Sequence, residues 1–142
     1  MAVERTLCII KPDAVEKRKA GAILQSIEEA GFRILALYMT HLTRDQAERF
    51  YNIHRERSFF GELVRFMTRS PVVVALLERE DAVARWRDVM GATDPAKAGP
   101  GTIRKMFGSN VGENASHGSD SLENARQEIA FFFAGREVSP TP

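Results

Sequence analysis

The apolar segment from Pro71 to Glu78 restricts the fold of this chain more than any other feature. Its first half is Val72-Val73-Val74, and β-branched residues favour extended backbone, so it is the clearest strand in the sequence. A second strand is predicted from Arg5 to Lys11, which contains a short buried run of apolar residues. A third is predicted from Phe32 to Thr40. The chain therefore has the material for a β-sheet.

Helical patterns occupy the intervals between these strands. A helix from about residue 21 to residue 30 carries its apolar side chains on one face: Ile23, Leu24, Ile27 and Ala30. Gly31 is a good C-terminal stop for this helix. Thr43 and Gln46 resemble a capping box that opens a second helix, which reaches Tyr51.

Three further helices are predicted at about 60–68, 81–90 and 121–133, and Asp120 to Glu123 resembles a capping box for the last of them. The order is strand, helix, strand, two helical pieces, strand, helix, long loop, short strand, helix. This is a βαββαβ pattern with additional helices. We therefore predict an α+β fold, a sandwich in which helices lie over one face of a four-stranded antiparallel sheet.

Composition excludes several classes of protein. The 142 residues suit one domain, 1–142, and a content of 44% hydrophobic and 27% charged residues is typical of globular proteins. A net charge of +1 gives no bulk electrostatic reason for a nucleic-acid or membrane partner. No apolar run approaches the roughly 18 residues of a membrane helix. The first five residues lack a signal-peptide pattern and Cys8 is the single cysteine, so we expect a cytoplasmic protein without intrachain disulfides.

The segment from Asn114 to Asp120 is the best candidate for chemistry. It follows an irregular stretch, 92–112, and long loops in compact domains are normally functional or disordered. His117 lies there among small and polar residues, so a substrate can reach its ring. Imidazole can accept a phosphoryl group or a proton because its unperturbed pKa lies near neutrality. The alternative is a turn histidine without a role.

Several cationic and polar residues flank this candidate: Lys11, Arg87, Thr93, Arg104 and Asn114. The forked donors of arginine suit phosphate oxygens, and the turn Gly99-Pro100-Gly101-Thr102 can bring backbone N–H groups near an anion. Each residue alone is compatible with a solvated surface position, but the set around a histidine favours phosphate chemistry. P-loop, G-x-G-x-x-G and protein-kinase motifs are missing, so such chemistry would use other devices.

Phe59 and Phe60 are a candidate base-binding element. Adjacent aromatic residues cannot both point into the core from the same face of one helix, so one is expected at a cleft. An aromatic face stacks on a nucleic-acid base with about 1–3 kcal/mol. The alternative is that both rings belong to the core.

Together these segments resemble the nucleoside diphosphate kinase family over about residues 4–133. The matching pieces follow the family order: Glu4-Arg5-Thr6, Ile10-Lys11-Pro12-Asp13, Arg57 to Phe60, Ser70 to Val73, Met90 to Pro95, Gly101 to Arg104, and Asn114 to Asp120. The pattern Asn-x-x-His-Gly-Ser-Asp is highly specific for the family. Lys-Pro-Asp is weak evidence alone and strong evidence only together with the other matching segments. The resemblance implies a ferredoxin-like fold.

The resemblance also implies a ping-pong phosphotransfer. A nucleoside triphosphate such as ATP would give its γ-phosphoryl group to His117, which would pass it to a nucleoside diphosphate. Glu128 would orient the imidazole through the other ring nitrogen, in keeping with the rule that a third group fixes a nucleophile. Ser119 would assist beside the histidine, and Lys11 would take part in catalysis.

The remaining implied roles concern the nucleotide. Its phosphates would be held by Lys11, Arg87, Thr93 and Arg104, with Tyr51 in support. Lys11 and Asn114 would meet the ribose hydroxyls. Phe59 and Val111 would enclose the base, and because stacking does not read base edges, purines and pyrimidines should both be accepted. Mg²⁺ would be held mainly by the nucleotide phosphates, without a dedicated protein cage.

Departures from the family pattern are Arg18, Ser58, Met106 and Ser116, which stand for glycine, proline, aspartate and a β-branched residue respectively. None is a catalytic position, so they concern loop packing and assembly. The family assembles from dimers into tetramers or hexamers, and the sequence leaves that choice open. Two alternatives also remain: a catalytically dispensable interaction protein on the same fold, and a nucleic-acid-binding protein, which the net charge of +1 disfavours.

Overall fold

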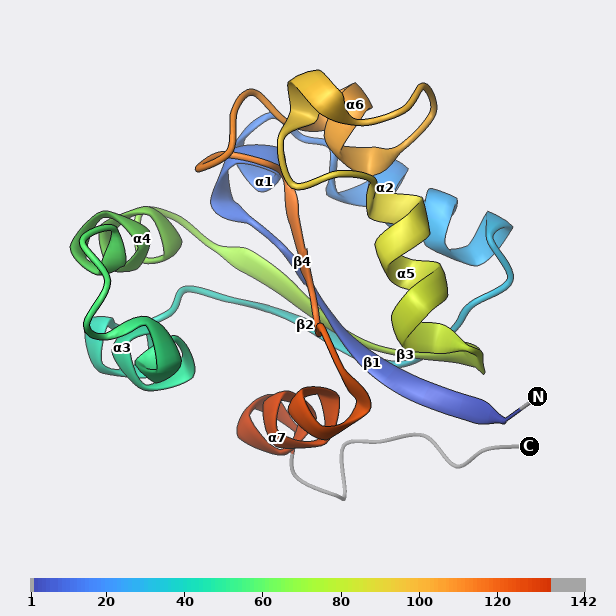
Figure 1. Ribbon diagram of the computed structural model, residues 1–142, viewed down its shortest axis with the longest axis horizontal. Helices are drawn as coiled ribbons and strands as arrows, with labels where there is room; N and C mark the ends of the chain where they lie inside the picture. Colours follow the sequence, from blue (N-terminus) through green and yellow to red (C-terminus); the bar gives the residue numbers. More distant parts are fainter. Residues whose placement is uncertain (1, 134–142) are drawn as a thin grey trace.

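A four-stranded antiparallel sheet forms the centre of the computed structural model, which describes residues 2–133 (Figure 1). Its strands are β1 (Val3–Ile10), β2 (Arg33–Thr40), β3 (Val72–Glu80) and β4 (Ser116–Gly118), in the spatial order β2-β3-β1-β4. β1 pairs with β3 without a break, from Val3 opposite Glu80 to Ile10 opposite Val73. The three long strands and the α+β class predicted from the sequence are confirmed. Met1 and residues 134–142 of the predicted domain lie outside the described part.

Helices cover both faces of this sheet, so the additional helices form a second layer that the prediction of one covered face did not include. One face carries α2 (Ala20–Glu29) and α5 (Ala82–Met90), and the other carries α3 (Arg44–Phe50), α4 (Phe60–Met67) and α7 (Leu122–Phe132) (Figure 1). Ile23 and Trp86 are buried in the first layer, and Val64 and Met67 in the second.

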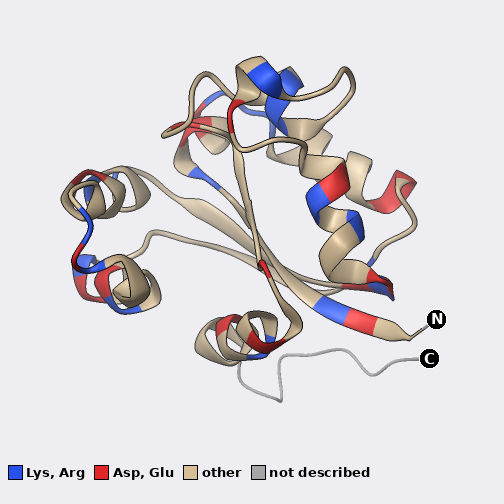
Figure 2. Ribbon diagram, in the orientation of Figure 1, with Lys and Arg blue, Asp and Glu red and all other residues tan. Residues whose placement is uncertain are grey.

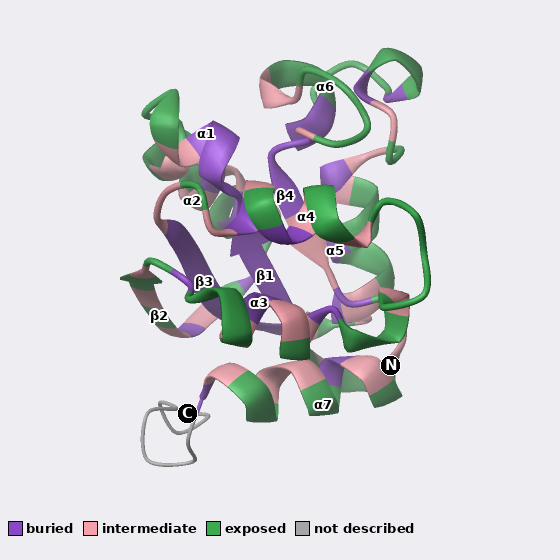
Figure 3. Cartoon of the chain, turned by 90° about the vertical axis from the view of Figure 1, so that its left-hand side faces the viewer, coloured by how far each residue is buried: buried purple, intermediate pink, exposed green. Residues whose placement is uncertain are grey.

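The physical reason for two layers is that the central strands are apolar at successive positions. Side chains alternate between the faces of a strand, so consecutive buried residues require cover on both sides. In β1, Cys8 and Ile10 pack toward α2 and α5, whereas Leu7 and Ile9 pack toward the opposite helices. Figure 3 shows buried parts of β1 and β3 behind α3 and α4. Cys8 is thus a core residue.

Short elements explain the irregular stretch predicted over 92–112. It contains a 3₁₀ turn, Pro95–Lys97, and α6 (Ile103–Phe107). The Asp94 carboxylate accepts from the N–H of Ala96 at 3.0 Å, and the Thr102 hydroxyl from that of Lys105 at 3.3 Å. Neither element is long enough to show a helical period. The same holds for α1 (Pro12–Glu16) and for a 3₁₀ turn at Asn52–His54, which were not predicted.

The helix caps agree with the sequence in one case and differ in another. At α3 the Thr43 hydroxyl accepts from the N–H of Gln46 at 3.1 Å, and the Gln46 side chain accepts in return at 2.9 Å, as predicted. At α7 the predicted box of Asp120 and Glu123 is wrong, because Ser121 is the cap and its hydroxyl accepts from the N–H of Asn124 at 3.0 Å. Within residues 2–133, no helix has the length and apolar character needed to cross a membrane.

Candidate active site

His117 lies in the short edge strand β4, opposite Ile9 of the central strand β1. Its ring is held between α3 and α7, 5.5 Å from the ring of Phe50 and 6.3 Å from that of Tyr51, measured between centroids. The indole N–H of Trp86 donates to the His117 carbonyl at 3.1 Å, which fixes the backbone from the other layer. The side chain is 18% exposed, so one edge of the imidazole remains open to solvent.

A chain of hydrogen bonds orients the imidazole. Glu128 on α7 holds its carboxylate oxygen Oε1 at 2.8 Å from Nε2 of His117 and accepts from the Ser119 hydroxyl at 2.9 Å. Ser119 in turn accepts from the N–H of Leu7 at 3.3 Å. Because an ionised carboxylate only accepts, Nε2 carries the ring proton and Nδ1 carries the free lone pair. No group within residues 2–133 hydrogen bonds to Nδ1, so that nitrogen can act as a nucleophile.

Tyr51 presents a buried hydroxyl close to this ring. Burial, together with the charge of Glu128, raises the pKa of the Tyr51 phenol above its usual value, so the group stays neutral. The hydroxyl has no hydrogen-bond partner in the described part of the chain. A buried donor without a partner is costly, and an incoming acceptor would satisfy it.

Lys11 connects three segments at the end of β1. Its ammonium donates to the Asn114 side-chain oxygen at 2.8 Å, and the Asn114 amide donates to the carbonyl of Thr93 at 3.0 Å. Burial and the nearby charge of Arg104 lower the pKa of Lys11 to about 8, against an opposing effect of Asp13. Thr93 itself is exposed in the loop after α5. The lysine is therefore held in place while its charge is destabilised.

Arg104 is a second buried cation, with 8% of its surface exposed. Its guanidinium donates to the carbonyls of Gly91 at 3.1 Å and Ser116 at 3.0 Å, and its buried Nε has no partner within residues 2–133. Burial and the charge of Arg87 lower the pKa of Arg104 to about 10. Arg87 is exposed on α5, and Figure 2 shows Lys and Arg on both α5 and α6. These cations lie together and would favour an anion between them.

Asp13 is a further component of the site, which only the weak Lys-Pro-Asp pattern indicated in the sequence. Its buried carboxylate accepts from the N–H of Ala115 at 3.1 Å, and the N–H of Lys11 donates to the Ala115 carbonyl at 2.9 Å. Ala115 has φ +74°, a left-handed conformation that costs about 1–2 kcal/mol in a residue other than glycine. These two bonds hold the strained residue and so fix the entry into β4, two residues before His117.

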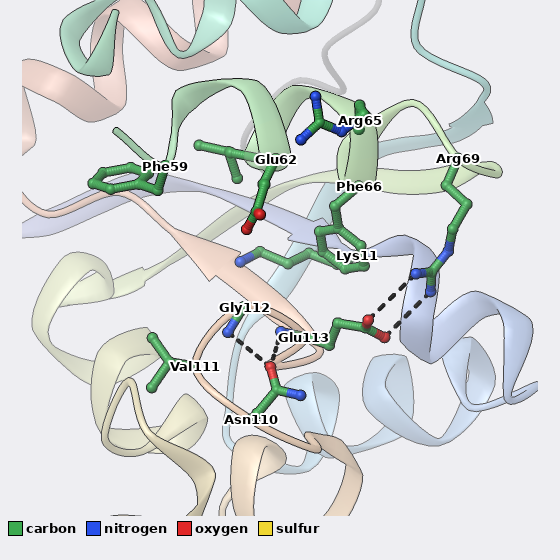
Figure 4. Close-up of a pocket in the computed structure, with 11 residues that line it drawn as sticks. Lys11, Phe59, Glu62, Arg65, Phe66, Arg69, Asn110, Val111, Gly112 and Glu113 are labelled. Carbon is green, nitrogen blue, oxygen red and sulfur yellow. Dashed lines mark hydrogen bonds and ion pairs between the residues drawn. The ribbon is translucent and has the colours of Figure 1, made fainter. Parts of the chain in front are cut away.

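A cleft of about 800 Å³ opens beside Lys11, between α4 and the loop before β4 (Figure 4). Phe59 and Val111 face it from opposite walls and are 46% and 56% exposed. Phe60 is less exposed and packs toward the core, so the two rings differ in environment as the sequence suggested. His117 does not line this cleft, and the two areas are joined through Lys11 and its bond to Asn114.

The four residues that depart from the family pattern lie in different environments. Arg18 has φ +62°, which explains why glycine suits that position. The Ser116 side chain is buried, and its hydroxyl has no partner in the described residues. Ser58 is exposed, and Met106 is 48% exposed on α6. Over residues 2–133, there is no group of three or more His, Cys, Asp or Glu side chains that could hold a metal ion.

Comparison with known proteins places these features in a family. A family model for nucleoside diphosphate kinase matches residues 4–138. A nucleoside diphosphate kinase of Sorangium cellulosum (strain So ce56) is 63% identical over 99% of the chain and 98% of the relative, and one of Rhodopseudomonas palustris (strain HaA2) is 60% identical over 97% and 99%.

Solved structures agree with this result. The nucleoside diphosphate kinase of Aquifex aeolicus superposes with a TM-score of 0.95 at 51% identity, covering 96% of this chain and 99% of the other. A halophilic nucleoside diphosphate kinase of Halobacterium salinarum, in complex with CDP, superposes with a TM-score of 0.94 at 35% identity, covering 99% and 94%. The chain therefore belongs to the nucleoside diphosphate kinase family of enzymes.

Proposed function

We propose that the chain transfers the γ-phosphoryl group of a nucleoside triphosphate to a nucleoside diphosphate through a phosphohistidine at His117. The observation that carries this proposal is the Glu128 carboxylate 2.8 Å from Nε2, which leaves the lone pair on Nδ1. Nδ1 attacks the γ-phosphorus, the bond to the bridging oxygen breaks, and a nucleoside diphosphate leaves. A terminal oxygen of the second diphosphate then attacks the phosphorus, and the N–P electron pair returns to Nδ1. Ser119 assists by fixing Glu128.

Charge stabilisation is the second part of the proposal. Phosphoryl transfer depends mainly on positioning and on neutralising the charge of the transferred group. That role falls to side chains that are cationic or carry a hydroxyl: Lys11, Tyr51, Arg87, Thr93 and Arg104. A Mg²⁺ ion carried in by the nucleotide, with phosphate oxygens as its main ligands, would neutralise further charge.

The nucleoside is proposed to lie in the cleft beside Lys11. Lys11 and Asn114 would bind the ribose hydroxyls, and the base would lie between Phe59 and Val111, which face each other across the cleft. The CDP bound to the Halobacterium salinarum enzyme supports a nucleotide as ligand. Stacking requires a flat face and no particular edge, so adenine, guanine, cytosine and uracil should all be accepted.

Replacing Phe59 with alanine tests the base site. The loss of one stacking face, about 1–3 kcal/mol, is expected to raise KM about 5- to 150-fold for every nucleoside diphosphate. The measurement is KM for ADP, GDP, CDP and UDP in a coupled assay. Phe131, which is 38% exposed on α7 and outside the cleft, provides the control Phe131→Ala. An increase confined to a single base would contradict stacking.

The pH dependence of kcat/KM tests Lys11. Its pKa of about 8 means that the side chain is cationic below this pH and neutral above it. Since kcat/KM reports on the free enzyme, it should fall as pH rises through about 8, whereas kcat should fall at higher pH because bound phosphates favour the cation. Lys11→Arg keeps its positive charge over this range, so its kcat/KM should not fall as pH rises through about 8. An unchanged fall in that variant would assign the titration to another group.

Intact-protein mass spectrometry tests the phosphohistidine directly. After incubation with ATP and Mg²⁺, the chain should gain one acid-labile phosphoryl group, which GDP or CDP then removes. A folded, nucleotide-binding chain that gains no phosphoryl group would favour an interaction protein on the same fold.

We further propose one domain, a cytoplasmic location, and assembly into a homo-oligomer, with neither membrane nor nucleic acid as a primary partner. β2 lies at an edge of the sheet, and its Leu37 and Met39 are 49% and 58% exposed. An exposed apolar edge strand is a natural contact for a second copy. Light scattering would distinguish a tetramer from a hexamer.

A further inference from the structure

Arg69, at the C-terminal end of α4, holds carboxylates from two other segments at once. Its Nε and Nη2 donate to the two oxygens of Glu16 on α1, at 3.0 and 2.7 Å. Its Nη1 and Nη2 donate to the two oxygens of Glu113, both at 3.3 Å (Figure 4). Two-point contacts of this kind use the fixed planar geometry of the guanidinium, so they restrain orientation as well as distance.

The partner Glu113 belongs to a tight turn that also carries Val111. The side-chain oxygen of Asn110 accepts from the N–H groups of Gly112 and Glu113, both at 3.0 Å, and the N–H of Ser109 donates to the Glu113 carbonyl at 2.8 Å. These hydrogen bonds therefore close the turn on itself. A contact that restrains Glu113 restrains Val111 with it.

The other side of Arg69 is equally constrained. Glu16 also accepts from the Ser70 hydroxyl at 2.6 Å, and the Arg69 and Ser70 contacts lower the pKa of Glu16, so its carboxylate stays charged. The Arg69 guanidinium lies 5.0 Å from the centre of the ring of Phe66, which is on α4. The contacts with Glu16 and Phe66 therefore fix the Arg69 side chain independently of its contact with Glu113.

We propose that Arg69 is a positioning residue that sets the spacing between the two walls of the nucleotide cleft. This inference rests on the proposed function, in which the base lies between Phe59 and Val111. α4 follows Phe59 directly and reaches Arg69 just beyond its last residue, so the same helix provides one wall and the restraint on the other. Holding the second wall before the ligand arrives lowers the ordering cost of binding.

The test is Arg69→Ala in the full chain, read in two ways. First, hydrogen exchange of the amides of residues 110–113 in the free protein should become faster. Second, KM for all nucleoside diphosphates should rise about two- to fivefold with kcat changed by less than about twofold, the range expected when exposed ion pairs are lost. Arg69→Lys should restore part of both effects, because one ammonium can pair with a carboxylate but lacks the fork.

Arg65→Ala is the matched control. Arg65 lines the same cleft one turn earlier on α4 and, among residues 2–133, it forms no ion pair with the turn. Its loss removes the same charge from the cleft, so any general electrostatic effect on KM appears there too, while exchange in the turn stays unchanged. Glu113→Gln should reproduce Arg69→Ala, and the double variant should add little.

Two outcomes would overturn the inference. Unchanged exchange in Arg69→Ala would show that the arginine does not hold the turn, and faster exchange with unaltered KM and unaltered CDP affinity would show that the turn does not shape the cleft. CDP affinity is measured by calorimetry beside KM. A chain that binds CDP but transfers no phosphate would therefore contradict the proposed function while still deciding the role of Arg69.

Discussion

Replacing His117 with alanine is expected to abolish phosphotransfer, by at least about 10⁴-fold in kcat, and to leave the fold intact. The chemistry fails because Nδ1 is the proposed attacking atom. The fold should persist because the contacts that hold β4 use its backbone, including the bond from Trp86 to the His117 carbonyl. Rates come from a coupled assay, phosphoryl incorporation from intact mass, and folding from circular dichroism.

His41→Ala is the control for this experiment. The ring of His41 is hydrogen bonded through Nε2 to the carbonyl of Thr68 at 2.7 Å, and the residue is exposed. It lies outside the set of residues around His117, so its removal should leave the rate unchanged. Activity of His117→Ala within about tenfold of the parent chain would rule out the covalent mechanism, since loss of a nucleophile has a far larger effect.

The second large effect is expected for Lys11→Met, which keeps the length of the side chain and removes its charge. Loss of a preorganised cation next to the transferred group should lower kcat/KM by about 10²–10³-fold. Thermal stability should fall little, because burial and Arg104 already disfavour the lysine cation in the fold. A large loss of activity with a nearly constant melting temperature is the expected pair of results.

Lys105→Met controls for the removal of a positive charge in this region. Lys105 is exposed on α6 beside Arg104 and is not among the residues that line the cleft. Replacing Lys105 should change neither kcat/KM nor the melting temperature. If Lys11→Met retained most of its activity, the charge stabilisation would have to come from the arginines alone. If it unfolded instead, Lys11 would be mainly structural through its bond to Asn114.

The sequence predicted the sheet well because the signal for it is local. Val72 to Leu77 and Leu7 to Ile10 are continuous apolar runs, and such runs need no distant information to be recognised as strands. The second helix layer was missed although the same apolar runs imply cover on both faces of the sheet. The runs do not reveal which helix packs on which face. α1 and α6 were missed because five residues are too few to show a helical period.

The arrangement around the site depended more on distant contacts. His117, the cationic and polar residues near it and the Phe59-Phe60 pair were candidates from the sequence alone, and the family resemblance added Tyr51, Val111, Ser119 and Glu128. The spacing of Lys11 and Asn114 along the chain gives no indication that their side chains meet at 2.8 Å. The bond from Ala115 to Asp13 and the pairing of Arg69 with Glu113 likewise join segments far apart in sequence. Such contacts leave no periodic pattern, so only the folded chain reveals them.

The register of β4 has an evolutionary consequence. The strand is three residues long, and its residues pair with the C-terminal end of β1, from Cys8 to Ile10. Ile9 and Ile10 are fully buried there. Because the close-packed core tolerates little displacement, pairing with these residues determines the position of the His117 imidazole. Surface helices and loops can drift in sequence without displacing it. A relative with 35% identity and a TM-score of 0.94 is what such an arrangement allows.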